Sequence, residues 1–231
     1  MSDGNEARIL KSWTHNVTPW TTAVRQQRID SRRLVTDTAI VEAVLSFAPE
    51  TVLDIGCGEG WLLRALSQQV QRGLGVDATE ALIAQARAAG GGEFRHASYD
   101  TLVRCAAGER FDLAVANFSL LGKASVTKVF ADMQQLLVPG GVFIVQTLHP
   151  QESCGKAPYV DGWRDGAWPD TDGTLTDPPP WYFRTLASWI GLFLDGGLEL
   201  LGVREPLHPA TGRPASILFI ARHGINAAPA A

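Results

Sequence analysis

Residues 52–61 constrain the fold of this chain more than any other segment. They read as a short apolar strand carrying an acidic residue, Asp54, followed by three alternating glycines and the start of a helix. The glycines are Gly56, Gly58 and Gly60. Because glycine has no Cβ atom, this spacing lets the backbone turn tightly and come close to a bound molecule. The segment therefore predicts a strand–turn–helix unit that holds a ligand.

Asp54 narrows the chemistry of that ligand. A carboxylate just before the first glycine would repel the phosphate groups of a dinucleotide held at the same turn. A ligand with a positively charged amino group would instead be attracted. S-adenosylmethionine, which carries an ammonium and a sulfonium, is such a ligand.

With a second acidic residue, Asp77, the chain resembles the class I, seven-stranded S-adenosylmethionine-dependent methyltransferases. Asp54 and the three glycines match the first motif of that family, and the resemblance covers about residues 45–223. In the family, an acidic residue at the position of Asp77 hydrogen-bonds the ribose hydroxyls of the methyl donor. A carboxylate suits that role because its two oxygens can accept from two neighbouring hydroxyls. The alternative is a buried glycine turn with Asp77 as a helix N-cap.

Composition limits the class of protein. The chain has 231 residues, a net charge of −4 and three widely spaced cysteines. An acidic chain is a poor nucleic-acid binder, and no apolar run approaches the roughly 20 residues that a membrane-spanning helix needs. The cysteines favour a reducing compartment over a disulfide framework or a zinc site. We therefore expect a cytoplasmic protein with a small-molecule acceptor and no nucleic-acid, membrane or metal partner; the oligomeric state cannot be read.

Strand-like and helix-like segments alternate after residue 45, which predicts a doubly wound α/β fold with a mostly parallel sheet. The resemblance implies seven strands, with an antiparallel last strand. Pro139, Gly140 and Gly141 are expected to form the turn into the fifth strand. The predicted strands are 51–55, 73–76, 93–96, 111–116, 142–147, 198–204 and 216–222, and the predicted helices between them are 61–70, 79–89 and 124–137.

The chain divides into three predicted parts. Residues 1–45 form an N-terminal helical cap, and residues 46–223 form the methyltransferase domain. Within that domain, residues 150–184 interrupt the alternation after the fifth strand and are expected to form a lid, because long insertions in compact domains usually serve binding. Residues 224–231 are rich in alanine and proline, and we expect them to be disordered.

Ligands of open parallel sheets bind beyond the carboxyl ends of the strands, so the residues there are candidate contacts. Ser98 and Tyr99 follow the third strand, where the resemblance implies adenine contacts; simple capping of the loop is the alternative. Asn117 and Phe118 follow the fourth strand, where the methionine part of the donor passes in the family. Residues 117–120 lack the Asn/Asp-Pro-Pro-aromatic box of the family's nucleic-acid enzymes, which disfavours nucleobase methylation.

His149 follows the fifth strand and is the candidate catalytic base. An alcohol or phenol must lose its proton to accept a methyl group, and an imidazole with a pKa near 6.5 suits that task. The alternative is a turn histidine bonded to the backbone. His208, in the loop between the last two strands, is the second candidate and would otherwise contact the acceptor.

Two residues of the cap are candidate ligand contacts. The resemblance implies that this segment folds over the bound donor, where Arg32 would meet the donor's carboxylate and Trp20 would contact the acceptor. A surface helix with a buried tryptophan is the alternative.

The lid contributes four further candidates for acceptor binding. Trp163 and Trp181 belong to an aromatic-rich stretch that could wall a pocket for a flat or apolar molecule. Arg164 and Arg184 could pair with an acidic group of the acceptor. The same aromatic side chains could instead be the small core of the lid.

The sequence therefore predicts an S-adenosylmethionine-dependent methyltransferase that acts on a small molecule, preferably at oxygen with His149 as base. Methylation of a small amine or heterocycle at nitrogen, where a base matters less, is the alternative. Another is a protein that binds S-adenosylmethionine without catalysis. A nicotinamide oxidoreductase could share the sheet, but Asp54 and the glycine spacing disfavour it.

Overall fold

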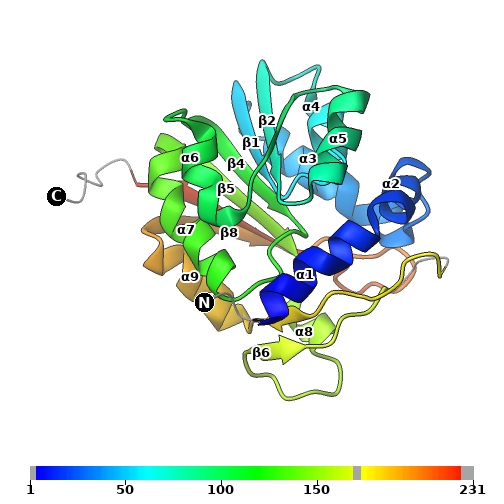
Figure 1. Cartoon of the computed structure of the whole chain (residues 1–231). Helices are drawn as coiled ribbons and strands as arrows, with labels where there is room; N and C mark the ends of the chain where they lie inside the picture. The colour runs from blue at the N-terminus through cyan, green and yellow to red at the C-terminus, as the bar shows by residue number, and fades with distance from the viewer. Residues whose placement is uncertain (1–3, 169–172, 225–231) are drawn as a thin grey trace.

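The computed structural model describes residues 4–168 and 173–224, which form a seven-stranded sheet flanked by helices (Figure 1). The strand order is β3-β2-β1-β4-β5-β9-β8, and β9 runs antiparallel to both of its neighbours. The doubly wound sheet and its antiparallel last strand are therefore confirmed. The strands are β1 Thr51–Ile55, β2 Arg72–Asp77, β3 Glu93–His96, β4 Phe111–Asn117, β5 Leu137–Thr147, β8 Leu198–Arg204 and β9 Ile217–His223.

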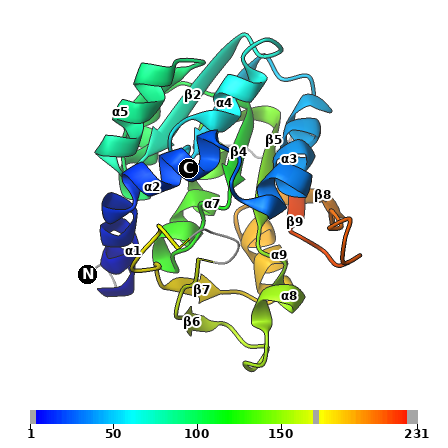
Figure 2. The ribbon, with the colours of Figure 1, turned by 90° about the vertical axis from the view of Figure 1, so that its right-hand side faces the viewer.

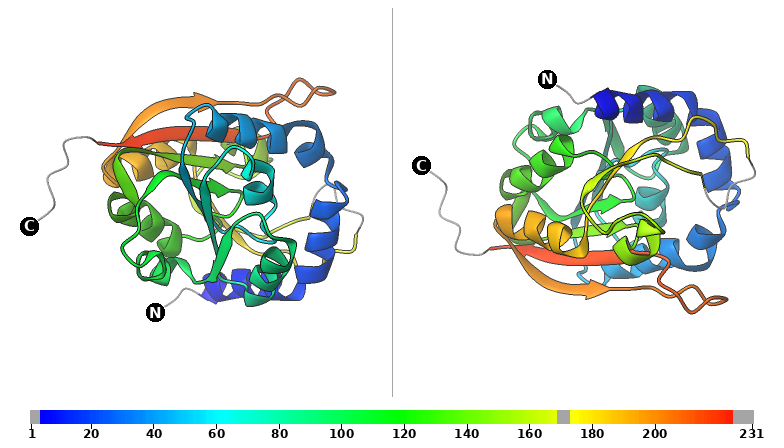
Figure 3. Two further views of the ribbon diagram at one scale, coloured as in Figure 1. Left: turned by 90° about the horizontal axis from the view of Figure 1, so that it is seen from above. Right: turned by 90° about the horizontal axis from the view of Figure 1, so that it is seen from below.

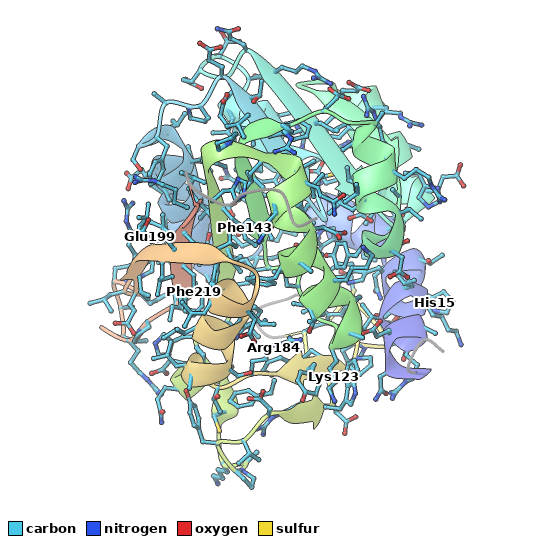
Figure 4. All side chains as sticks on the ribbon, turned by 90° about the vertical axis from the view of Figure 1, so that its left-hand side faces the viewer. His15, Lys123, Phe143, Arg184, Glu199 and Phe219 are labelled. Carbon is cyan, nitrogen blue, oxygen red and sulfur yellow. The ribbon has the colours of Figure 1, made fainter. Side chains whose placement is uncertain are left out.

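Helices cover both faces of the sheet, so the central strands are apolar on both sides. One face carries α3 (Asp37–Leu45), α4 (Trp61–Leu66) and α5 (Glu80–Ala89), and the other carries α6 (Leu102–Ala106), α7 (Ala124–Leu136) and α9 (Leu186–Asp195). Figure 4 shows Phe143 and Phe219 on the sheet face that α7 and α9 cover. Alternation along each strand divides the buried side chains between two hydrophobic clusters, one on each face.

The cap and the lid meet on the same side of the sheet (Figures 1 and 2). The cap contains α1 (Gly4–His15), α2 (Val17–Arg25), the π-helical turn η1 (Arg32–Thr36) and α3. The lid contains α8 (Pro150–Cys154) and a two-stranded antiparallel sheet of β6 (Gly162–Arg164) and β7 (Trp181–Phe183). Seen from below in Figure 3, the lid runs beside α1 and α2.

Several details differ from the sequence expectations. β5 begins at Leu137 and includes Pro139, Gly140 and Gly141, because a shift in its pairing with β4 accommodates the positive φ of Gly140 (+80°) within the strand. α4 ends four residues early, at Leu66. The lid has regular structure of its own, and α9 follows it. Residues 225–231 of the expected disordered tail lie outside the described residues.

Among the described residues, no helix combines the length and the apolar character that crossing a membrane requires. Cys57, Cys105 and Cys154 are free thiols.

Candidate functional site

The turn after β1 requires its glycines. Gly56, Gly58 and Gly60 have φ values of +74°, +55° and +81°, a region that other residues rarely occupy. A Cβ atom on Gly56 would collide with the side chain of Ser119, and one on Gly60 would lie 2.7 Å from the ring of Phe94. The Gly56 N–H donates to the Val76 carbonyl of the neighbouring strand (2.7 Å). The turn is thereby held against the end of β2.

Asp77 ends β2 beside this turn. Its carboxylate accepts hydrogen bonds from the Gly58 N–H (3.0 Å) and the Thr79 N–H (2.7 Å). Burial raises the pKa of Asp77, and the two backbone hydrogen bonds oppose that rise. The structure thus places a carboxylate in direct contact with the glycine turn, at the position where sequence predicts the ribose contact.

Asp54 is a buried carboxylate in β1, 2% exposed, and none of the described ion pairs involves it. Burial, and to a lesser extent the charge of Asp77, raises its pKa to about 8. A buried carboxylate without a cationic partner is unfavourable when ionised. A cationic group brought to this position would therefore favour the ionised form of Asp54.

A row of polar residues continues from Asp54 across the neighbouring strands. Asn117 ends β4, and it pairs in register with Gln146 of β5. Both lie on the sheet face of Asp54, because each is two residues after a member of the cluster beneath α3–α5, Val115 in β4 and Ile144 in β5. Gln146 was not predicted as a site residue. Its signal was a polar side chain at the end of an apolar strand.

Unpartnered polar atoms concentrate around this row. Among the described residues, seven buried side-chain nitrogen or oxygen atoms have no hydrogen-bond partner, and buried polar atoms are normally paired. All seven come from the carboxyl ends of β4 and β5, from the turn after β5, from the cap or from the end of β7. They are Thr21 Oγ1, Arg32 Nη2, Thr36 Oγ1, Asn117 Oδ1, Gln146 Oε1, His149 Nδ1 and Arg184 Nη1. A polar ligand at this edge of the sheet would give these atoms partners.

The cap brings Trp20 and Arg32 to the glycine turn. A Cβ atom on Gly58 would lie 3.7 Å from Trp20 Nε1, so the indole stands directly over the turn. The guanidinium of Arg32 lies 5.6 Å from the ring centre of Trp20 and 4.7 Å from that of Trp61. Its Nε donates to Asp37 (2.9 Å), while Nη2 is buried and unpartnered. Arg32 thus has one nitrogen available for an anionic ligand.

A buried ion pair anchors α2 on the same turn. Glu59, within the turn, is fully buried and accepts from Arg25 Nε (2.8 Å) and Arg64 Nη2 (2.5 Å). Arg25 also donates to the Gln85 carbonyl of α5 (3.1 Å). Glu59 was not predicted as a site residue, although the sequence has an acidic residue between two of the glycines. This network fixes the cap relative to the glycine turn.

Ser98, Tyr99 and Phe118 take different positions at the ends of β3 and β4. The Ser98 hydroxyl and carbonyl both contact Thr101, at 3.5 and 3.1 Å, which fits loop capping. The Tyr99 hydroxyl donates to the Ser119 carbonyl (2.9 Å), and burial raises its pKa. Phe118 has a φ of +53° and donates its N–H to Gln146 (2.8 Å). Tyr99 and Phe118 therefore shape the loop that packs on Gly56.

Cap and lid are joined by direct hydrogen bonds. Asn16 is fully buried; its amide donates to the Thr176 carbonyl (2.7 Å) and accepts from the Thr176 N–H (2.9 Å). The Ser12 hydroxyl donates to the Asp177 carbonyl (2.5 Å). Trp13 contacts both Trp20 and the lid's Trp168, at centroid distances of 5.0 and 5.4 Å. The cap and the lid thus close over the glycine turn as one unit.

We expect Asn16→Ala to separate cap from lid. The substitution leaves the Thr176 N–H without its partner and removes one of the two hydrogen bonds that the Thr176 carbonyl accepts, the other coming from Trp168 Nε1. A buried group that stays unpaired costs about 1–3 kcal/mol. Hydrogen-exchange mass spectrometry should show faster exchange in residues 4–25 and 173–177. Thr14→Ala, an exposed change two residues away in α1, is the control and should leave exchange unaltered. Unchanged exchange in both segments of Asn16→Ala would contradict the coupling.

The two candidate bases differ in their surroundings. His149 is the N-cap residue of α8, and its Nε2 lies 2.6 Å from Glu205 Oε1 in the loop between β8 and β9. His208 lies in the same loop, and its Nδ1 accepts from the nearby Ala210 N–H (3.3 Å). Figure 3 shows this loop projecting from the body of the protein. His149 lies two residues after the end of β5, whereas His208 lies in this projecting loop.

Three of the four lid candidates contact other residues of the lid. Trp163 packs edge-on against Tyr182, and Trp181 packs edge-on against Phe183. The Arg164 guanidinium lies 4.1 Å from the ring centre of Phe183 and donates to the Pro158 carbonyl (2.7 Å). These contacts match the alternative in which the aromatic residues form a small core for the lid.

Arg184 differs from the other lid candidates because it is almost completely buried, at 3% exposed. Its Nη2 donates to the Lys123 carbonyl at the start of α7 (3.0 Å), and Nη1 has no partner. Figure 4 shows Arg184 and Lys123 at the end of α7 next to the lid. Burial lowers the pKa of Arg184 to about 10, against the longer-range attraction of Asp161 and Glu6. A buried guanidinium with no carboxylate in contact is a candidate anion contact.

Comparison with known proteins finds methyltransferases among the relatives of this chain. A family model described as a methyltransferase domain matches residues 52–141. The "Ubiquinone biosynthesis O-methyltransferase" of Methylobacterium sp. (strain 4-46) is 32% identical over 174 residues, which cover 71% of this chain and 66% of that protein. The "Trans-aconitate 2-methyltransferase" of Acidovorax ebreus is 32% identical over 123 residues, 52% of this chain and 46% of that protein. The chain thus spans about two thirds and about half of the lengths of these curated relatives.

Among solved structures, an S-adenosylmethionine-dependent methyltransferase from Mesorhizobium loti superposes with a TM-score of 0.61 at 26% identity. The superposition covers 83% of this chain and 97% of that one. The strand order and the glycine turn define the class of protein: the chain belongs to the class I S-adenosylmethionine-dependent methyltransferases, which have a Rossmann-like fold. S-adenosylmethionine is the cofactor of that family.

Proposed function

We propose that this protein is a cytoplasmic enzyme that transfers the methyl group of S-adenosylmethionine to a hydroxyl of a small molecule, with His149 as general base. The observation that carries the proposal is the gathering of buried, unpartnered polar atoms at one edge of the sheet, beside the glycine turn. These atoms offer both acceptors and donors. A zwitterionic donor and a polar acceptor need this combination.

The residues around the turn fit each part of the donor. Asp77 would accept hydrogen bonds from the ribose hydroxyls, and Asp54 would face the ammonium. Arg32 Nη2 would donate to the carboxylate, because it is buried, unpartnered and close to Trp20 over the turn. Ser98 and Tyr99 would border the adenine. Asn117 and Phe118, at the end of β4, would lie along the methionine part.

The reaction needs alignment and one proton transfer. S-adenosylmethionine supplies an electrophilic methyl group, whose bond to sulfur breaks with both electrons left on sulfur as the bond to the acceptor oxygen forms. His149 Nδ1 takes the hydroxyl proton, so the oxygen can attack. Holding the two reactants in line can contribute up to about 7–11 kcal/mol to lowering the barrier. The cap and lid exclude water by closing over the turn.

Arg184 supports an acceptor that carries an acidic group. Its buried Nη1 would pair with that group, while Trp20, Trp163 and Trp181 would contact the rest of the molecule and His208 its rim. Arg164 is held by carbonyls of the lid and would act from a second position. The similarity to a relative named for O-methyl transfer supports oxygen as the acceptor atom.

The binding of the donor should depend on pH through Asp54. In the free protein, Asp54 has a pKa of about 8 and holds a proton at pH 6 to 7. The donor's ammonium favours the ionised carboxylate, so the proton must leave on binding. The affinity for S-adenosylhomocysteine should therefore rise with pH, by up to about tenfold per unit, and level off above about pH 8.

Calorimetry at pH 6, 7 and 8 measures this dependence directly. 5′-Methylthioadenosine shares the nucleoside but lacks the amino group, so its affinity should not rise with pH. Asp54→Asn should remove the dependence for S-adenosylhomocysteine. An equal rise for both ligands would contradict the assignment of Asp54 to the ammonium.

Product analysis tests the proposed reaction. Hydroxy acids, phenols and matched amines, each with labelled S-adenosylmethionine, form a suitable acceptor panel. We expect label on the oxygen of an acidic hydroxyl compound, located by mass spectrometry and NMR. Label found on nitrogen with the amines alone would overturn the choice of oxygen.

A further inference from the structure

The loop between β8 and β9 contacts α8 at two points that the proposed reaction leaves unexplained. Glu205 Oε1 lies 2.6 Å from His149 Nε2, and Arg213 Nη2 lies 2.5 Å from Glu152 Oε2. Both contacts join residues that are more than 50 positions apart in the chain. The loop is therefore fixed against the segment that carries the candidate base.

The partner of Nε2 decides which nitrogen of His149 can accept a proton. An ionised carboxylate only accepts hydrogen bonds, so Nε2 carries the hydrogen in the pair with Glu205. In the neutral ring, the lone pair then lies on Nδ1. Nδ1 is buried and has no partner among the described residues. The nitrogen that could take a proton is thus the one turned away from the carboxylate.

Exposure separates the two members of the pair. The His149 side chain is 12% exposed and that of Glu205 is 54% exposed. A half-exposed carboxylate contributes only modestly through its charge, because solvent screens it. Its larger effect is geometric: it fixes the ring orientation and the tautomer, which a catalytic base requires.

We propose that Glu205 is a positioning residue that holds His149 as the Nε2–H tautomer with Nδ1 directed at the acceptor hydroxyl. The inference rests on the proposed function, in which His149 Nδ1 takes the proton. The imidazolium formed in that step keeps its Nε2–H bond to Glu205 and later returns the proton to solvent. The sequence alone contains no trace of this pair, because Glu205 is 56 residues from His149.

Other charged groups near this loop act on the same ring from further away. Glu152 of α8 is paired with Arg213, so their charges largely offset each other. Glu42 of α3 and Arg204 line a hollow of about 270 Å³ next to Glu205. Glu205 is the carboxylate in direct contact with the imidazole. Replacing Glu205 should therefore alter the tautomer of His149 more than replacing Glu152 or Glu42 does.

Imidazole NMR of the full chain tests the tautomer without an acceptor. The ¹⁵N-labelled protein contains five histidines, and the signal of His149 is the one lost in His149→Ala. Long-range ¹H–¹⁵N spectra should show neutral His149 as the Nε2–H form. In Glu205→Gln, whose amide can also donate, the Nδ1–H form should appear. An unchanged tautomer would overturn the proposal.

Kinetics distinguish this proposal from the proposed function. With an acceptor from the panel, Glu205→Gln should lower kcat about 10- to 100-fold and leave the KM for S-adenosylmethionine unchanged. Glu152→Gln removes an equal charge from the neighbouring contact and should stay near the wild-type rate. If His149→Ala is slow and Glu205→Gln has the wild-type kcat, the role of Glu205 is refuted and the proposed base stands. If His149→Ala itself has the wild-type kcat, the proposed base is refuted and this inference with it.

Discussion

Replacing Asp77 by alanine is expected to weaken the binding of S-adenosylhomocysteine by at least about 100-fold in calorimetry. Two hydrogen bonds from ribose hydroxyls to an ionised carboxylate are worth about 1.5–3 kcal/mol each, so losing both costs at least about 3 kcal/mol. The carboxylate also accepts from Gly58 and Thr79, so its loss loosens the turn that lies under the ligand. Both effects weaken binding.

Two further variants separate these effects. Asp77→Asn retains an oxygen that can accept from one backbone N–H, and it should still bind at least about tenfold more weakly. Glu80→Ala changes an exposed carboxylate three residues away, in the first turn of α5, and should bind as the wild type does. Undiminished affinity of a folded Asp77→Ala protein would reject the ribose assignment.

Replacing His149 by alanine should lower kcat by about 10²–10⁴-fold, the usual contribution of a positioned general base. The side chain lies on the β5–β9–β8 side of the sheet edge, away from the glycine turn after β1. Donor binding should therefore remain within about twofold of the wild type, and the loss should fall on kcat rather than on the KM for S-adenosylmethionine.

The control for this variant is His208→Ala, in the projecting loop between β8 and β9. Its kcat should fall far less than that of His149→Ala, because the contact of the His208 Nδ1 is with its own turn, and any loss should appear in the KM for the acceptor, whose rim His208 would contact. Equal losses in the two variants would indicate that the loop as a whole matters, and full activity of His149→Ala would remove this residue from the mechanism.

The sheet could be predicted from the sequence because its signals are local. The predicted strands 51–55, 93–96 and 198–204 match the bounds of β1, β3 and β8. β1 and β8 are mostly apolar, whereas Phe94 is the one apolar residue of β3, whose start is marked by the three glycines at 90–92. α9 was missed, since Leu186–Asp195 is apolar almost all round and shows no clear polar face. β6 and β7 were missed because each is only three residues long and depends on its partner.

The residues of the proposed site also divide into those that a local sequence pattern marks and those that it does not. Asp54, the glycines and Asp77 lie in one motif and its neighbouring strand, so the sequence places them together. Gln146, Glu59 and Glu205 acquire their roles from partners that are 70, 34 and 56 residues away. No local pattern marks such pairs. Only the folded chain shows which polar atoms are buried without a partner, and those atoms carry the rest of the proposed site.

A crystal structure with S-adenosylhomocysteine tests the central claim most directly. We expect the ribose hydroxyls within hydrogen-bond distance of the Asp77 carboxylate. The amino group should lie beside Asp54, and the ligand's carboxylate should accept from Arg32 Nη2. A ligand bound elsewhere on the sheet, or bound at the turn with both carboxylates directed away from it, would contradict the account.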